Sequence, residues 1–151
     1  MKLSPRFLTL LILVLSALPV AALERPESKD VAQNYLLFCG GCHGDAGRGV
    51  PHKVPVLNGS MGRYLKVDGG REFLMRVPGV ANSQLSDGAL TAVINLCIDK
   101  FADGGRGTDF KPYTVAEVTA ARRHPLLSVS RTRRELLLKA GVSEAEITEN
   151  Y

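Results

Sequence analysis

The sequence predicts an all-α fold, organised as one small helical domain followed by a short helical extension. Apolar side chains recur at helical spacing in residues 28–38 and again in residues 86–101. Two capping-box patterns, which begin at Thr114 and Ser143, predict further helix starts near the end of the chain. If an N-terminal segment is removed as argued next, about 129 residues remain, which is the size of a single hydrophobic core.

Residues 1–22 have the pattern of a secretory signal peptide. Lys2 and Arg6 form a positive start, and an apolar run follows over residues 7–18. That run is too short to span a bilayer comfortably, and the small residues that end it predict cleavage after about Ala22. We therefore expect a periplasmic mature chain without a membrane span.

The first helix is predicted from about Ser28 to Phe38. Ser28 is a suitable N-cap residue because its hydroxyl can accept a hydrogen bond from a free backbone N–H. Val31, Tyr35 and Phe38 share one face at i, i+4 and i+7. This helix leads directly into the pentapeptide Cys39-Gly40-Gly41-Cys42-His43.

The pentapeptide has the C-x-x-C-H pattern of covalent haem attachment. The spacing of Cys39 and Cys42 lets each thiol add to one vinyl group of a haem. His43 follows directly and would lie under the iron as its proximal ligand. The sequence therefore predicts one covalent haem c per chain, with Cys39, Cys42 and His43 as the cofactor-binding residues and His43 as the metal ligand.

Two other uses of a C-x-x-C pair fit less well. A thioredoxin-like redox pair needs a surrounding βαβ unit, which the sequence does not show. A zinc site needs a second pair of ligands, and only the scattered Cys97, His52 and His124 remain to supply it.

The segment after the pentapeptide, residues 44–60, is rich in glycine and proline and is predicted to be a loop against the haem edge. His52 in this loop is interpreted as a solvent-exposed residue rather than an iron ligand. Around Pro55 the backbone offers carbonyls, and one of them could accept a hydrogen bond from Nδ1 of His43. Such a bond would fix the tautomer and orientation of the imidazole.

Three helices are predicted after the loop: residues 60–67, residues 70–77 and, most strongly, residues 86 to about 101. Pro78 is expected to stop the second, and Ser86 is a plausible N-cap of the third. The apolar stripe of this third helix consists of Leu90, Val93, Ile94, Cys97 and Phe101. Cys97 is interpreted as a small buried hydrophobic residue rather than a ligand or a disulfide partner.

The order of these elements over residues 28–101 resembles a small class I c-type cytochrome. The matching features are the helix that enters the haem motif, the glycine-rich loop, the residues Pro55, Leu57 and Gly59, the pair Phe73-Leu74, and the opening Leu85-Ser86-Asp87 of the last helix. The resemblance implies a cytochrome c-like fold in which the first and last helices cross and the haem edge is exposed for electron transfer. It also implies the attachment and ligand roles given above for Cys39, Cys42 and His43.

The sequence departs from that family at the sixth position on iron. The family usually has Met-Pro a few residues before the last helix, whereas this chain has Val77-Pro78. Met75 is the best available thioether, and an open or weakly ligated iron is the alternative. Met61, His52, Asn82 and Cys97 are weaker candidates.

Residues 23–110 are predicted to form the haem domain, and residues 111–151 a basic helical extension. Helices are expected over residues 114–124 and about 128–140, with a short final turn from residue 143. Apolar positions are few in this extension, so we expect its helices to pack on the haem domain or to stay partly mobile.

Charge is divided unevenly between the two segments. The whole chain has a net charge of +4; residues 23–110 carry ten basic and ten acidic residues, and residues 111–151 carry seven and five. The basic residues of 122–139 are Arg122, Arg123, Arg131, Arg133, Arg134 and Lys139, against a single acidic residue, Glu135. This segment is either a solvated helical face or a docking surface for an acidic redox partner. The export signal disfavours nucleic acid as a partner.

Together these observations predict a periplasmic monohaem cytochrome c that carries single electrons between redox partners and is not an enzyme by itself. One alternative is a haem enzyme or a gas- or ligand-binding protein with an open distal iron. His52 with Arg48 is the nearest candidate for the distal acid–base pair that an enzyme needs. Another alternative is an accessory haem subunit of a dehydrogenase.

Overall fold

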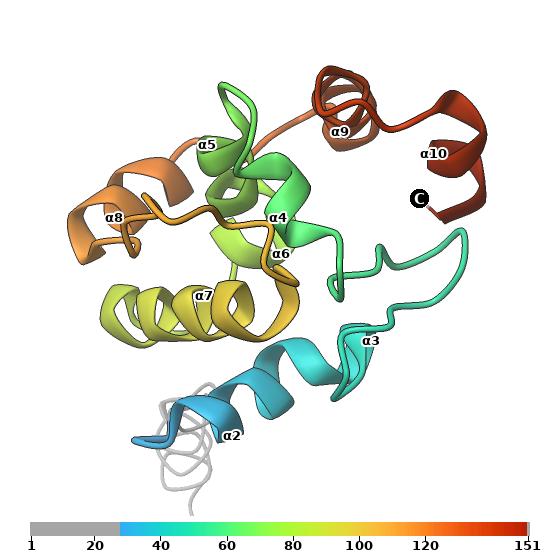
Figure 1. Ribbon diagram of the computed structural model, residues 1–151. Helices are drawn as coiled ribbons and strands as arrows, with labels where there is room; N and C mark the ends of the chain where they lie inside the picture. The colour runs from blue at the N-terminus through green and yellow to red at the C-terminus, as the bar shows by residue number, and fades with distance from the viewer. Residues whose placement is uncertain (1–27, 151) are drawn as a thin grey trace, which may run out of the picture.

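The computed structural model describes residues 28–150 and shows an all-α fold, as the sequence predicts (Figure 1). The helices are α2 (Val31–Tyr35), the π-helix η1 (Leu36–Gly40), α3 (Gly41–His43), α4 (Met61–Tyr64), α5 (Gly70–Arg76), α6 (Pro78–Ala81), α7 (Asp87–Phe101), α8 (Val115–Arg122), α9 (Val129–Lys139) and α10 (Glu144–Asn150). Among these residues, β-structure is limited to one isolated bridge between Val50 and Val54. The predicted signal peptide lies outside the described residues.

None of the helices in the described range has both the length and the apolar character needed to cross a membrane.

The first helix begins later than the sequence predicts. Asp30, not Ser28, is its N-cap, and the Asp30 carboxylate accepts a hydrogen bond from the N–H of Ala32 at 2.9 Å. The Ser28 hydroxyl instead accepts from the N–H of Asp30 at 3.0 Å. Both residue types suit an N-cap, and the local pattern did not reveal which of them holds the position.

Helix α2 packs against α7, as the family resemblance implies (Figure 1). At their contact the rings of Tyr35 and Phe101 have centroids 5.6 Å apart. Helix α7 is the centre of the core because its predicted stripe is buried throughout. Ser86 is its N-cap, as predicted, and accepts from the N–H of Ala89 at 3.2 Å. Cys97 lies buried on this stripe, as expected for a small hydrophobic residue.

Pro78 ends α5 as predicted, but it also begins a helix that the sequence analysis missed. Val77 has a ψ of 137°, which turns the chain out of α5, and Pro78 then occupies the first turn of α6. Proline is well suited to this position because a first-turn N–H has no partner within the helix. The short α6 lies in the segment where the family would have its methionine.

The helices of the extension pack on the rest of the molecule. Helix α8 packs against α5 and α7, and α9 packs against α4 and α5. Val118 of α8 and Leu137 of α9 have no exposed surface. The capping box predicted at Thr114 and Glu117 is present in full. The two segments on either side of residue 110 thus share one hydrophobic core.

Arg71 and Arg122 are two of the arginines that join residues 28–110 to the segment after residue 110. Arg71 of α5 forms two hydrogen bonds to the Glu117 carboxylate, at 3.0 and 3.1 Å, and lies 4.0 Å above the ring of Tyr113. Arg122 of α8 donates to the carbonyls of Ala81, Ser83 and Leu85 and to the Asp87 carboxylate at 2.7 Å. The second arginine therefore fixes the whole chain segment between α6 and α7.

Candidate haem site

The pentapeptide lies on one continuous helical segment that runs from α2 through η1 to α3. Cys39 is in the π-helical turn and partly buried, whereas Cys42 and His43 are in α3, with Cys42 exposed and His43 partly buried. Widened turns of this kind are frequent at functional sites. Both thiols are free, so the segment presents two thiols and an imidazole within five residues.

His43 is held by the bond that the sequence analysis anticipates. Its Nδ1 lies 3.0 Å from the carbonyl oxygen of Pro55. A carbonyl can only accept, so Nδ1 carries the proton and Nε2 keeps its lone pair for a metal. Burial lowers the pKa of His43, the Pro55 carbonyl opposes this, and the positive charge of Arg133 lowers the pKa further. The imidazole is therefore favoured in the neutral form that a metal requires.

The loop that carries Pro55 is fastened at several points. The N–H of Gly49 donates to the His43 carbonyl at 2.9 Å, and the N–H of Gly59 donates to the Phe101 carbonyl at 2.9 Å. Gly49 has a φ of 63°, and a Cβ there would lie 2.3 Å from the Val54 carbonyl oxygen, so only glycine fits. These contacts fix the Pro55 carbonyl opposite the imidazole.

Two buried side chains, Tyr35 and Cys97, belong to the core against which the partly buried Cys39 packs. The hydroxyl of Tyr35 donates to the Gly44 carbonyl at 2.6 Å, and burial, followed by the nearby charges of Cys97 and Cys39, raises the pKa of Tyr35 to about 12. Burial raises the pKa of Cys97 to about 12 as well. These two side chains thus stay neutral at pH 7.

The candidates for the sixth position on iron are distributed as follows. Met75 is 4% exposed and belongs to the core cluster, and Met61 is also buried. Asn82 is exposed, directly after α6. His52 is exposed at the tip of the loop with a φ of 58°, as the sequence interpretation has it. The part of the chain that the structure describes contains no group of three or more His, Cys, Asp or Glu residues suited to a metal ion.

The basic residues of 122–139 do not form one surface. Arg122 is turned inward onto the α6–α7 segment, and Arg133 lies close enough to His43 to affect its pKa. Arg134 pairs with Glu144, while Arg123, Arg131 and Lys139 are exposed. The sequence analysis did not predict that Arg122 and Arg133 are partly buried, because it counted charges along the chain and not around each helix. The i, i+4 spacing of Val129 and Arg133 is the pattern that could have placed Arg133 on the apolar face of its helix.

The residues present fit a haem c. Two free thiols at the right spacing can form the thioether bonds, and the imidazole after them has one nitrogen fixed and the other available for iron. Leu36 and Leu37 on the same helical segment are 53% and 38% exposed, so apolar surface lies beside the thiols. The donor set therefore agrees with haem and not with a zinc site, which needs four ligands.

Comparison with known proteins agrees with this chemistry. The chain is 33% identical over 121 residues to cytochrome c-552 of Thermus thermophilus, an alignment that covers 67% of this chain and 92% of the relative. Cytochrome c-552 of a further T. thermophilus strain matches at the same identity, with 82% of its length covered. No protein-family model matches the chain. By its relatives and its all-α fold, this chain belongs to the small c-type cytochromes, haem proteins that carry electrons.

Proposed function

We propose that this protein is an exported, periplasmic electron carrier with one haem c, attached through Cys39 and Cys42 and ligated by His43. The observation that carries the proposal is the 3.0 Å contact between Nδ1 of His43 and the Pro55 carbonyl, next to two free thiols at the attachment spacing. This contact leaves Nε2 of His43 available as a proximal ligand. The apolar run over residues 7–18 supports export.

Each part of the site has a separate task in electron transfer. The bound haem supplies the one-electron couple between ferric and ferrous iron. Pro55 accepts from Nδ1 and makes the imidazole a better donor to the metal. The buried side chains of Tyr35 and Cys97 keep water out of the core against which Cys39 packs. A carrier rather than an enzyme is supported by the similarity to cytochrome c-552.

Intact mass spectrometry tests the attachment. Protein exported from a host with haem-attachment machinery is expected to weigh as much as the chain from Leu23 plus one haem, and acid-acetone should not extract the pigment. The double variant Cys39→Ala/Cys42→Ala should lose the attachment, whereas Cys97→Ala, the matched control, should keep it. A native protein whose mass lacks haem would contradict the proposal.

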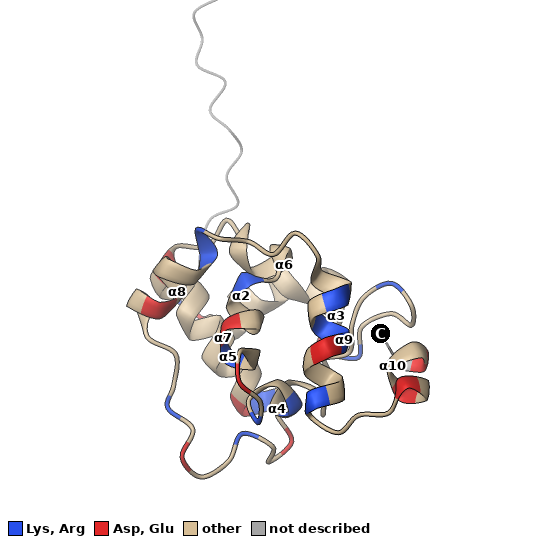
Figure 2. Ribbon diagram, turned by 90° about the horizontal axis from the view of Figure 1, so that it is seen from above, with Lys and Arg blue, Asp and Glu red and all other residues tan. Residues whose placement is uncertain are grey.

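We place docking of a redox partner on the exposed basic residues of α9, which are Arg131, Arg134 and Lys139. Figure 2 shows several basic positions along this helix. A partner with an acidic surface would be steered to them by charge, which raises the encounter rate at low ionic strength. Arg133 is left out of this surface because it is partly buried.

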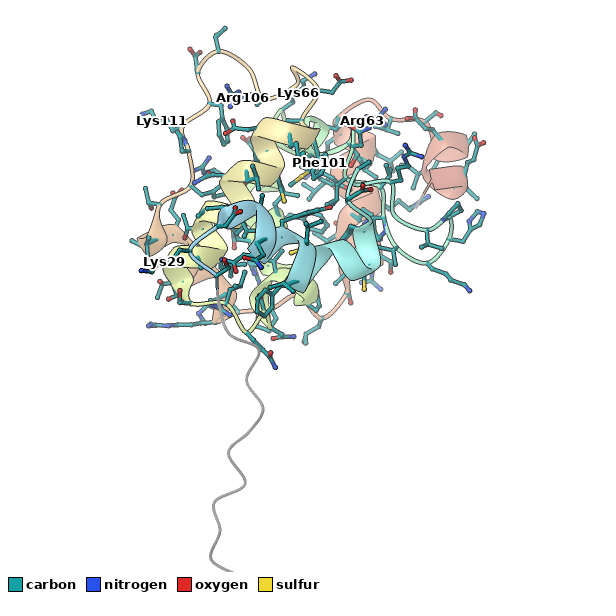
Figure 3. All side chains as sticks on the ribbon, turned by 90° about the horizontal axis from the view of Figure 1, so that it is seen from below. Lys29, Arg63, Lys66, Phe101, Arg106 and Lys111 are labelled. Atoms are coloured by element: carbon teal, nitrogen blue, oxygen red, sulfur yellow. The ribbon has the colours of Figure 1, made fainter. Side chains whose placement is uncertain are left out.

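Glutamine substitution of these three residues should slow electron transfer to an acidic partner several-fold at low salt, and the effect should shrink as salt rises. The control replaces three exposed lysines elsewhere, namely Lys66, Lys100 and Lys111, two of which lie along another edge of the molecule beside Arg106 (Figure 3). Equal rates for both triple variants would contradict docking on α9.

A further inference from the structure

Ser60 has the position of an N-cap but does not act as one. It directly precedes α4, and a serine there normally accepts a hydrogen bond from a backbone N–H of the first turn. Its side chain makes no such bond. The hydroxyl instead donates backward along the chain, to the carbonyl of Val56 and to that of Leu57 at 3.1 Å. This side chain therefore holds the loop between α3 and α4 (Figure 1) rather than the helix that it precedes.

The Val56 carbonyl depends on this hydroxyl. In residues 28–150, no backbone N–H donates to it. The Leu57 carbonyl, in contrast, also accepts from the N–H of Ser60 at 3.0 Å and from that of Met61 at 3.3 Å. Because Ser60 is only 3% exposed, water has poor access to the position of its hydroxyl. Loss of the hydroxyl would leave the partly buried Val56 carbonyl without its donor, which is unfavourable.

The bond from Ser60 fixes the peptide group next to the Pro55 carbonyl. This group, between Val56 and Leu57, is held at both ends. Its carbonyl accepts from the Ser60 hydroxyl, and its N–H donates to the Gly47 carbonyl at 2.8 Å. Because peptide groups are planar, only the φ and ψ of Val56 separate this plane from the plane that contains the Pro55 carbonyl. A movement of the first plane therefore changes the orientation of the second.

The peptide group on the other side of Pro55 is held by the backbone. The N–H of Val50 donates to the Val54 carbonyl, which belongs to the peptide group before Pro55, at 2.9 Å. The ring of Pro55 also restricts its own φ. The orientation of the Pro55 carbonyl thus depends on a side chain only on its far side, and that side chain is Ser60.

We infer that Ser60 is a positioning residue for the proximal histidine and tunes the reduction potential of the haem iron. Its hydroxyl keeps the Pro55 carbonyl in the orientation that accepts from Nδ1 of His43 at 3.0 Å. The inference rests on the proposed role of His43 as ligand of a covalent haem. A firm hydrogen bond at Nδ1 makes the imidazole a better donor to the metal. A better donor favours ferric over ferrous iron, because the ferric ion carries the greater positive charge.

Spectroelectrochemical titration of the haem-bearing protein tests the inference. In Ser60→Ala, the ratio of ferrous to ferric protein at a fixed potential should rise about threefold, which is an upward shift of about 30 mV for one electron. The matched control is Thr91→Val. Thr91 is also buried, and its hydroxyl donates to a carbonyl four residues earlier, that of Asp87, at 2.6 Å. This control loses a bond of the same kind within α7 and should keep the wild-type potential.

A second measurement reports directly on the hydrogen bond of His43. Nuclear magnetic resonance of the ferrous protein at fixed pH gives the rate at which the Nδ1 proton exchanges with solvent. This rate should increase several-fold in Ser60→Ala and stay unchanged in Thr91→Val, because only the first variant releases the Pro55 carbonyl.

A wild-type potential or a wild-type exchange rate in Ser60→Ala would overturn the inference. Equal changes in Ser60→Ala and Thr91→Val would overturn it as well, since any lost buried hydroxyl would then have the same effect. These outcomes leave the proposed function intact, because it is judged separately by the covalent haem in the mass spectrum.

Discussion

The segment Leu36–His43 and the junction of α7 with α8 are built in opposite ways. In the first, none of the eight residues is fully buried, although three of them are Leu36, Leu37 and Phe38. In the second, seven of the fifteen residues of α7 are buried, and Arg122 and Glu117 bind neighbouring elements. The difference shows that the junction is stabilised by the chain's own contacts. Residues 36–43 instead present apolar and reactive groups outward, as the proposed binding of a cofactor requires.

The strongest test of this contrast is Arg122→Ala. The substitution removes hydrogen bonds to the carbonyls of Ala81, Ser83 and Leu85, and it should lower the free energy of unfolding by about 2–3 kcal/mol. Denaturant unfolding of the haem-bearing protein measures it. Arg123→Ala, its exposed neighbour, is the control and should change stability by less than about 0.5 kcal/mol. Equal losses in both variants would mean that the junction does not depend on this arginine.

A smaller effect is expected in the haem segment from Tyr35→Phe. The variant loses the 2.6 Å hydrogen bond from the hydroxyl to the Gly44 carbonyl while it keeps the buried ring. The free energy of unfolding should fall by about 1 kcal/mol. Because Gly44 follows His43, hydrogen exchange at residues 43–49 should increase more than exchange in α8. An equal increase of hydrogen exchange at residues 43–49 and in α8 would contradict this expectation of a local effect.

The smallest effect concerns acid stability at the junction. The hydrogen bonds from Arg71 lower the pKa of Glu117 from 4.5 to about 2. A lowered carboxyl pKa contributes stability that is fully present above pH 4.5 and is lost as the pH falls toward 2. The contribution should be only about 0.5 kcal/mol, since solvent screens a carboxylate that is 39% exposed. Between pH 5 and pH 3, the free energy of unfolding measured with denaturant should fall less in Glu117→Gln than in wild type. An identical fall in both proteins would show that the pair of Arg71 and Glu117 does not contribute to acid stability.

What could be predicted from the sequence was local. The stripe of α7, its N-cap Ser86 and the capping box at Thr114 follow from spacings within one or two turns, and all are present. The contact of His43 with Pro55 spans twelve residues. It could be predicted because proline has no backbone N–H, so the backbone around it offers carbonyl acceptors.

The remainder depends on contacts between distant segments. Arg122 meets acceptors 35 to 41 residues away, and Arg133 affects His43 from the far end of the chain. Contacts between such distant residues produce no recognisable spacing in the sequence. A sequence segment with several arginines therefore looks like a uniformly charged surface, whichever of them are buried. The N-cap at Asp30 was missed because Ser and Asp suit that position equally well. The helix after Pro78 was missed because proline can both end one helix and begin the next.

The ion pair between Arg63 of α4 and Glu146 of α10 joins residues that are 83 positions apart. Because a ribosome releases the N-terminal part of a chain first, Cys39 and Cys42 are synthesised well before α9 and α10. Helix α9, which lies above α3 in Figure 1, is therefore still absent while the thiols are first available. Biosynthesis thus has a natural order, in which α9 and α10 join the fold only after the segment with the two thiols has been made.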